Sequence, residues 1–221
     1  MPLMTMRQGR WLGPAGMLLA SLLLLGCNGG DGGGQWSEQD FGPNNQNICL
    51  ALGDSITAGS CLPNYSLGYI PKLAEMLQKN IINVAIPGSD TSVGVDIVHP
   101  ALDRTLPGFL LVLYGVNDLI VGYSEAGALY NLRTIVRAAQ DNHTVPIIAT
   151  LTPVSGSYIG LVSGIKRLNA GIRQLADEEG AYLVDLEKAL AWDPAYLLAD
   201  GLHPNAMGNV IMAAEFYDIL H

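Results

Sequence analysis

Five short apolar runs alternate with helix-like segments between residue 48 and the end of the chain. The runs are Ile48–Leu52, Ile81–Ile86, Phe109–Tyr114, Val145–Leu151 and Ala181–Leu186. Each run has the length and composition of a buried strand, and the segments between them repeat apolar residues at a helical period. Strands that alternate with helices form crossover units, which build a parallel sheet with helices on both faces. We therefore predict an α/β fold, a three-layer α/β/α sandwich around a five-stranded parallel sheet.

The helical repeats also predict which side chains face the core. One helix is expected to bury an apolar stripe that comprises Leu129, Leu132, Ile135, Val136 and Ala139. For the last helix the expected stripe is Met207, Val210, Ile211, Ala214 and Tyr217.

The front of the chain is typical of a targeting signal. Arg7 and Arg10 precede an apolar stretch, Trp11–Leu25, which is shorter than the ~20 residues that a membrane-spanning helix needs. A basic start followed by a short apolar stretch predicts a signal peptide that is removed from the mature protein.

The end of that stretch, Leu24-Leu25-Gly26-Cys27, resembles the lipobox of bacterial lipoproteins. The resemblance implies cleavage before Cys27 and attachment of lipid to its sulfur; the alternative is an ordinary signal peptide with an incidental cysteine. Asn28 in place of Asp implies sorting to the outer membrane. We expect residues 1–26 to be the signal peptide, 27–47 the lipidated cysteine with a flexible glycine-rich linker, and 48–221 the folded domain.

The charge of the chain excludes one class of partner. It has 11 basic and 20 acidic residues, a formal net charge of -9, and no basic cluster. Nucleic-acid binding needs clustered Lys and Arg, so we predict no nucleic-acid partner.

The chain has three cysteines. If Cys27 is lipidated, Cys49 and Cys61 remain as an even pair in an oxidising compartment, where they could form a disulfide that braces the loop between them. The alternative is two unpaired small side chains, because the distance between their Cα atoms cannot be read from sequence.

Polar clusters follow several of the predicted strands. They are Gly53-Asp54-Ser55, Pro87-Gly88-Ser89-Asp90-Thr91-Ser92, Gly115-Val116-Asn117-Asp118 and, before the last helix, Asp200-Gly201-Leu202-His203. The carboxyl ends of parallel strands meet at one edge of the sheet, where ligands bind. These clusters are therefore candidates for one shared site.

Two of these clusters contain the residues of a serine-nucleophile site. Asp200 and His203 are three residues apart around a glycine, a spacing that allows the Asp to hold one imidazole nitrogen while the other faces a serine. Ser55 follows a strand at a sharp turn, as an exposed nucleophile requires. The alternatives are structural: Asp54 and Ser55 cap a helix, His203 caps the last helix, and Asn117 closes a turn. We assign His99, His143 and His221 to the surface, since none has such a neighbour.

Taken together, the four clusters resemble in order and spacing the four sequence blocks of the GDSL or SGNH hydrolases, over residues 48–220. Residues 83–92 resemble the second block of one branch of this family, the periplasmic arylesterases, thioesterases and lysophospholipases. The resemblance implies a flavodoxin-like sheet order and an esterase that needs no cofactor and no metal.

The resemblance also implies a role for each residue. Ser55 would be the nucleophile, His203 the general base, and Asp200 the group that orients His203. The oxyanion hole would comprise the backbone N–H groups of Ser55 and Gly88 and the side-chain amide of Asn117. We expect glycine at position 88 because a close approach of backbone to substrate leaves no room for a Cβ atom. The chain departs from the family at two points: the second block is one residue longer after Gly88, and Ala85 replaces a glycine.

The expected activity is hydrolysis of carboxylic esters or thioesters by an acyl-enzyme mechanism. The substrate would be a small-molecule or lipid ester, and the protein a monomer anchored in the cell envelope through Cys27. A deacetylase of envelope polysaccharide is the alternative enzyme, and a non-catalytic binding lipoprotein is the alternative from another class. The apolar residues Leu119, Ile120, Val121 and Tyr123 favour acyl chains slightly, unless they pack as core.

Overall fold

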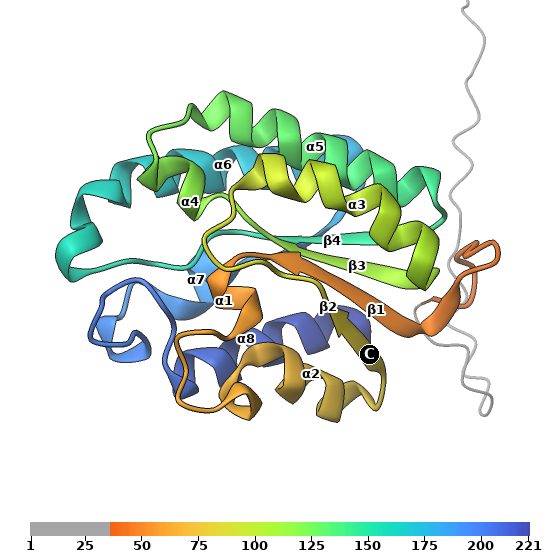
Figure 1. Cartoon of the computed structure of the whole chain (residues 1–221), viewed down its shortest axis with the longest axis horizontal. Helices are drawn as coiled ribbons and strands as arrows, with labels where there is room; N and C mark the ends of the chain where they lie inside the picture. Colours follow the sequence, from red (N-terminus) through yellow and green to blue (C-terminus); the bar gives the residue numbers. More distant parts are fainter. Residues whose placement is uncertain (1–35) are drawn as a thin grey trace, which may run out of the picture. The chain divides into compact units, whose positions relative to one another are not determined.

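The computed structural model describes residues 36–221, whose chain forms one parallel sheet with helices on both of its faces (Figure 1). The strands are β1 (Asn45–Gly53), β2 (Asn80–Asn83), β3 (Pro107–Leu113), β4 (Val145–Ala149) and β5 (Tyr182–Val184). They pair in the order β2-β1-β3-β4-β5, and every pair is parallel. The predicted α/β fold with a five-stranded parallel sheet is confirmed.

Two layers of helices cover this sheet, as Figure 1 shows. One layer contains α3 (Thr91–Thr105), α5 (Glu125–Asp141) and α6 (Val162–Glu179), and the other contains α2 (Tyr69–Leu77) and α8 (Ala206–Leu220). Short helices follow the strands: α1 (Ser55–Ala58), α4 (Val116–Ile120) and α7 (Leu186–Leu190). Three 3-10 turns complete the elements of residues 36–221: η1 (Tyr65–Leu67), η2 (Gly156–Leu161) and η3 (Pro194–Tyr196).

The strand order determines where a ligand can bind. The chain leaves β1 toward β2 on one side and then crosses to β3 on the other side of β1. The connecting helices α2 and α3 lie on opposite faces of the sheet (Figure 1). In folds of this kind, ligands bind at the carboxyl ends of the two strands where the chain changes direction, here β1 and β3. In the view of Figure 1, α1 and α4 begin at this edge.

The core is built on the central strands. Every residue of β3 is buried, and so is β1 from Cys49 onward, which is why both read as continuous apolar runs. The stripe predicted for the helix now labelled α5 is largely confirmed, since Leu132, Ile135, Val136 and Ala139 are buried there.

The face predicted for the last helix is partly wrong. Helix α8 buries Met212, Ala213, Phe216 and Leu220, whereas Met207 and Val210 are exposed. The helix is apolar on most of its surface, so the pattern of apolar residues did not indicate which side faces the sheet.

The predicted boundary of the linker at residue 47 is also wrong for the described residues. Strand β1 begins at Asn45, and Phe41 is buried with its ring 5.3 Å from that of Phe109. The Trp36 ring lies 5.0 Å from the same phenylalanine and 4.8 Å from Tyr182. These aromatic contacts hold residues 36–47 against the sheet and make them part of the domain.

The remaining predictions for the front of the chain, the signal peptide at 1–26 and lipidation of Cys27, lie outside the described residues. Within residues 36–221, no helix has both the length and the apolarity required to cross a membrane.

Candidate active site

Ser55 is placed by a sharp turn from β1 into α1. Strand β1 ends at Gly53, and Asp54 caps the helix by accepting a hydrogen bond from the backbone N–H of Ile56 at 2.9 Å. A Cβ atom at position 53 would lie 2.2 Å from the Thr57 hydroxyl oxygen and 2.8 Å from the Leu113 carbonyl oxygen. The turn is therefore tight enough to require glycine, and it presents Ser55 at the edge of the sheet.

His203 and Asp200 complete a hydrogen-bond chain that starts at this serine. The Ser55 Oγ lies 2.8 Å from His203 Nε2, and His203 Nδ1 lies 2.8 Å from Asp200 Oδ2. When Nδ1 carries the proton and donates to the carboxylate, Nε2 is left to accept from the serine hydroxyl. The structure thus brings together the three residues that the sequence predicted for a triad.

The Asp200 carboxylate is held in its ionised form. Its partial burial alone would raise the pKa, but the backbone N–H groups of Leu202 and His203 both donate to Oδ1, and the imidazole adds a third hydrogen bond. The net effect lowers the pKa of Asp200 below its usual range. A carboxylate held in this way stays charged at neutral pH and fixes the orientation of His203.

Gly88 lies in the loop after β2, with a φ of +77°. A Cβ atom at this position would meet no other protein atom within 4 Å, so packing of the chain does not require glycine there, and the expected close approach to substrate stays a prediction. The positive φ is what requires glycine, because side-chain-bearing residues rarely adopt it. The adjacent Ser89 closes the turn, with its backbone N–H and its hydroxyl both donating to the Ile86 carbonyl oxygen.

Asn117 is the second residue of α4, which follows β3 at the same edge of the sheet. Its side-chain amide donates to the Ser89 carbonyl oxygen at 2.9 Å and to Asp54 Oδ2 at 3.2 Å. Both N–H bonds of the amide therefore have partners. To bind an oxyanion, the amide would have to give up one of these two hydrogen bonds. The bond to Asp54 is the longer and therefore the weaker of the two.

Two buried carboxylates support the site; the sequence indicated Asp54 only as a helix cap and assigned no role to Asp118. Burial raises the pKa of Asp54 to about 6, against the opposing effects of the Ile56 N–H and the nearby His203. Burial also raises the pKa of Asp118, whose carboxylate accepts hydrogen bonds from the backbone N–H and the hydroxyl of Thr91. Asp118 thus ties α4 to the start of α3.

Of the two alternatives for Cys49 and Cys61, the disulfide is wrong and the unpaired side chains are confirmed, since both cysteines are free. Cys49 lies within β1, four residues before Gly53, or about 13 Å from the carboxyl edge at the rise of a strand. Burial raises its pKa to about 11. Cys61 instead lies at the carboxyl edge, with its Sγ 3.3 Å from His203 Nε2. Partial burial, and then the charge of Asp200, raise the pKa of the Cys61 thiol.

Among the described residues, Cys61, Asp200 and His203 form a cluster of potential metal ligands. The sequence had indicated no such cluster, because Cys61 and His203 are 142 positions apart. A hollow of about 10 Å³ adjoins this cluster. It is lined by Ser55, Ile56, Gly59, Cys61, Leu62, His203, Pro204 and Asn209.

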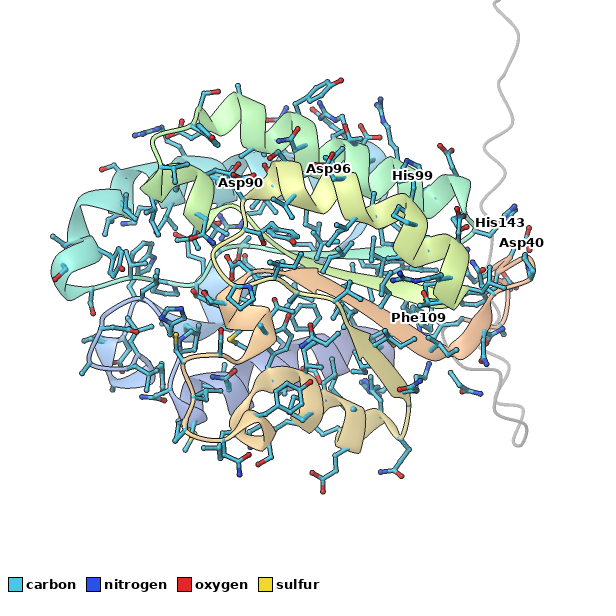
Figure 2. All side chains as sticks on the ribbon, viewed as in Figure 1. Asp40, Asp90, Asp96, His99, Phe109 and His143 are labelled. Carbon is cyan, nitrogen blue, oxygen red and sulfur yellow. The ribbon has the colours of Figure 1, made fainter. Side chains whose placement is uncertain are left out.

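A larger hollow, of about 320 Å³, lies where the strands begin rather than where they end. Asp40 and His143 line it and lie near Phe109 in Figure 2, away from the carboxyl edge. It contains no sequence-predicted site residue, so the chemistry belongs to the carboxyl edge. Figure 2 also shows His99 on α3, where it is exposed, as predicted.

Comparison with known proteins gives the same fold and a family. The family model of the GDSL-like lipases and acylhydrolases matches residues 51–211. No curated protein sequence matches the chain.

Three solved structures illustrate the likeness in fold. A lipolytic protein of the G-D-S-L family from Veillonella parvula has 20% identity and a TM-score of 0.70, over 78% of this chain and 97% of its own. The psychrotrophic esterase EstA from Pseudoalteromonas has 22% identity and a TM-score of 0.64, over 78% and 95%. An acetylxylan esterase from Geobacillus stearothermophilus has 19% identity and a TM-score of 0.69, over 80% and 95%.

The family model covers most of the chain, including the segments that carry Ser55, Gly88, Asn117 and His203. This chain therefore belongs to the GDSL-like lipase/acylhydrolase family and is an ester-hydrolysing enzyme.

Proposed function

We propose that the protein is a serine esterase in which Ser55, His203 and Asp200 act as a catalytic triad. The observation that carries the proposal is the unbroken hydrogen-bond chain from the Ser55 hydroxyl through the imidazole to the Asp200 carboxylate, with 2.8 Å at both steps. Distances in this range are those of a nucleophile that is hydrogen-bonded to its general base.

The reaction proceeds through two acyl transfers. His203 Nε2 accepts the proton of Ser55 as the serine oxygen attacks the ester carbonyl carbon, and Asp200 stabilises the resulting imidazolium. The developing oxyanion is bound by the backbone N–H groups of Ser55 and Gly88 and by the Asn117 amide. His203 then returns the proton to the leaving alcohol or thiol, and water hydrolyses the acyl-enzyme by the reverse sequence of proton transfers.

The favoured substrates are esters with an apolar acyl or aryl group. Several exposed large apolar side chains belong to segments that follow the strands at the carboxyl edge: Tyr65, Ile86, Ile120, Val121, Tyr123 and Ile159. Of the residues expected to contact acyl chains, Leu119 packs against the core, whereas Ile120, Val121 and Tyr123 are solvent-accessible. These surfaces suit an apolar substrate group that extends beyond the serine.

The second candidate is an O-deacetylase of envelope carbohydrate. The observation that favours it is the small volume of the hollow beside Ser55, about 10 Å³, which is close to the space that one water molecule needs. An acetyl group requires less room than a longer acyl chain. The acetylxylan esterase with a similar fold supports this candidate.

Hydrolysis of p-nitrophenyl esters from acetate to palmitate separates these possibilities. We would compare the full-length wild type with Ser55→Ala and with Ser66→Ala, which changes an exposed serine in η1. We expect Ser55→Ala to lose activity on every ester and Ser66→Ala to keep it. An optimum at acetate would favour the deacetylase, and an optimum at longer chains the acyl esterase. Equal rates for wild type and Ser55→Ala would reject the triad.

A further inference from the structure

We propose that Cys61 and His203 form a binding site for a thiolate-preferring divalent cation such as Zn²⁺, and that the bound ion switches the esterase off. Cys61 belongs to the segment between α1 and η1 and is exposed, so an ion can reach it from solvent. No step of the proposed ester hydrolysis, on which this inference rests, uses the Cys61 side chain. Its contact with the catalytic imidazole therefore needs a separate explanation.

The separation of the two donor atoms fits one metal ion. Cys61 Sγ and His203 Nε2 are 3.3 Å apart. A tetrahedral Zn²⁺ has Zn–S and Zn–N bonds of about 2.3 and 2.0–2.1 Å, which place the two ligand atoms about 3.6 Å apart. Thiolate and imidazole are also the ligand types that Zn²⁺ prefers. A movement of a few tenths of an ångström in an exposed side chain is enough to complete the geometry.

Asp200 also orients the imidazole of His203 for metal binding. It accepts a hydrogen bond from Nδ1 at 2.8 Å, which leaves the lone pair of Nε2 directed toward Cys61 and Ser55. A carboxylate that orients a histidine in this way is the usual outer-shell partner of a zinc ligand. The arrangement that makes His203 a base toward Ser55 therefore also makes it a metal ligand.

The surroundings leave room for a small ion. The hollow lined by Ser55, Cys61 and His203 has a volume of about 10 Å³, which suits a single water or ion. Ser55 Oγ, 2.8 Å from Nε2, and solvent would supply the other positions. With only two protein ligands of nitrogen and sulfur type, the ion would bind more weakly than in a structural site with four and would dissociate when removed by a chelator.

Binding changes the protonation of one group only. The Cys61 thiol releases its proton to solvent and forms a sulfur–metal bond, and no oxidant or reductant takes part. The lone pair of His203 Nε2 is then shared with the metal and can no longer accept the Ser55 proton. Catalysis stops because the base is occupied.

The test combines a direct binding measurement with inhibition. Co²⁺ bound through a cysteine gives a thiolate-to-metal charge-transfer band in the near ultraviolet, which requires no esterase activity. We would titrate Co²⁺ into the full-length wild type, Cys61→Ala and the control His143→Ala, whose histidine lines the hollow at the opposite end of the strands. In parallel, Zn²⁺ would be titrated into the p-nitrophenyl ester assay, with each rate taken relative to that variant's own metal-free rate.

We expect the band in wild type and His143→Ala and its absence in Cys61→Ala. The Zn²⁺ concentration for half inhibition should rise at least about tenfold in Cys61→Ala, since even an outer-shell partner of a metal ligand is worth about 10- to 100-fold in affinity. A chelator should restore the wild-type rate. The same band or the same Zn²⁺ sensitivity in wild type and Cys61→Ala would overturn the proposal. If the wild type hydrolysed no ester, the proposed function would fail, whereas the cobalt band would still show whether Cys61 binds a metal ion.

Discussion

Replacement of the buried Asp54 by asparagine should change how the stability of the enzyme depends on pH. Asp54 has almost no contact with solvent, and burial raises the pKa of its carboxyl group from 3.8 in the unfolded chain to about 6. The folded protein therefore prefers the protonated acid, and ionisation of Asp54 costs stability. This cost is absent below about pH 4, grows as the pH rises from about 4 to 6, and is fully present above about pH 6.

The magnitude follows from the size of the shift. A difference of about two pKa units between the folded and unfolded states corresponds to about 3 kcal/mol. An asparagine side chain cannot ionise, so the variant lacks this pH-dependent cost, although it loses part of the hydrogen bonding to Ile56 and Asn117 at every pH. The unfolding free energy of wild type minus that of Asp54→Asn should therefore fall by about 3 kcal/mol between pH 4 and pH 7.

Urea unfolding of both proteins at half-unit pH intervals measures this difference, because titration of all other groups cancels in the subtraction. Asp103→Asn, which removes the same charge at an exposed position on α3, is the matched control and should show no comparable fall. A difference that stays constant, or that rises with pH, would refute the reasoning. It would mean that the hydrogen bonds from Ile56 and Asn117 and the charge of His203 outweigh burial and keep Asp54 ionised.

Two further substitutions test the site and the fold. Asn117→Ala removes an oxyanion donor and should lower kcat by about 100- to 1000-fold with little change in KM for the most reactive p-nitrophenyl ester; an unchanged kcat would exclude Asn117 from the oxyanion hole. Phe41→Ala leaves a cavity beside Phe109 and should lower the unfolding free energy by about 3–5 kcal/mol. Tyr130→Ala, at an exposed position on α5, is its control. Equal stability of the two variants would show that residues 36–47 are not part of the core.

The sequence predicted the features that local pattern determines. The central strands are buried on both faces, so Leu50 and Leu111 appear in unbroken apolar runs. Asp200 and His203 are three residues apart, and one turn brings them together, so their pairing could be inferred from spacing alone. In each case the information lies within a few neighbouring residues.

The features that were missed depend on contacts between distant segments. Cys61 approaches His203 only after the whole sheet has formed, and no short-range pattern marks that contact. Residues 36–47 contain the glycine, proline and asparagine of a loop, but the aromatic rings of Trp36 and Phe41 fix them to Phe109 far along the chain. Composition indicates whether a segment forms regular structure, and it does not indicate whether an irregular segment is packed.

The contact between His203 and Ser55 spans most of the width of the sheet. The loop of His203 follows β5, which is three strands away from β1 in the sheet, a distance of about 14 Å at the usual strand spacing. The loop crosses this distance by attaching to the segment after β4, where the Ser155 N–H donates to the Gly201 carbonyl oxygen at 2.7 Å. A Cβ atom at position 201 would lie 2.5 Å from the Ser155 carbonyl oxygen, and φ there is +76°. Gly201 thus permits the close approach of the two loops, and this approach places His203 beside Ser55. Gly201 therefore positions the site although it takes no part in the chemistry.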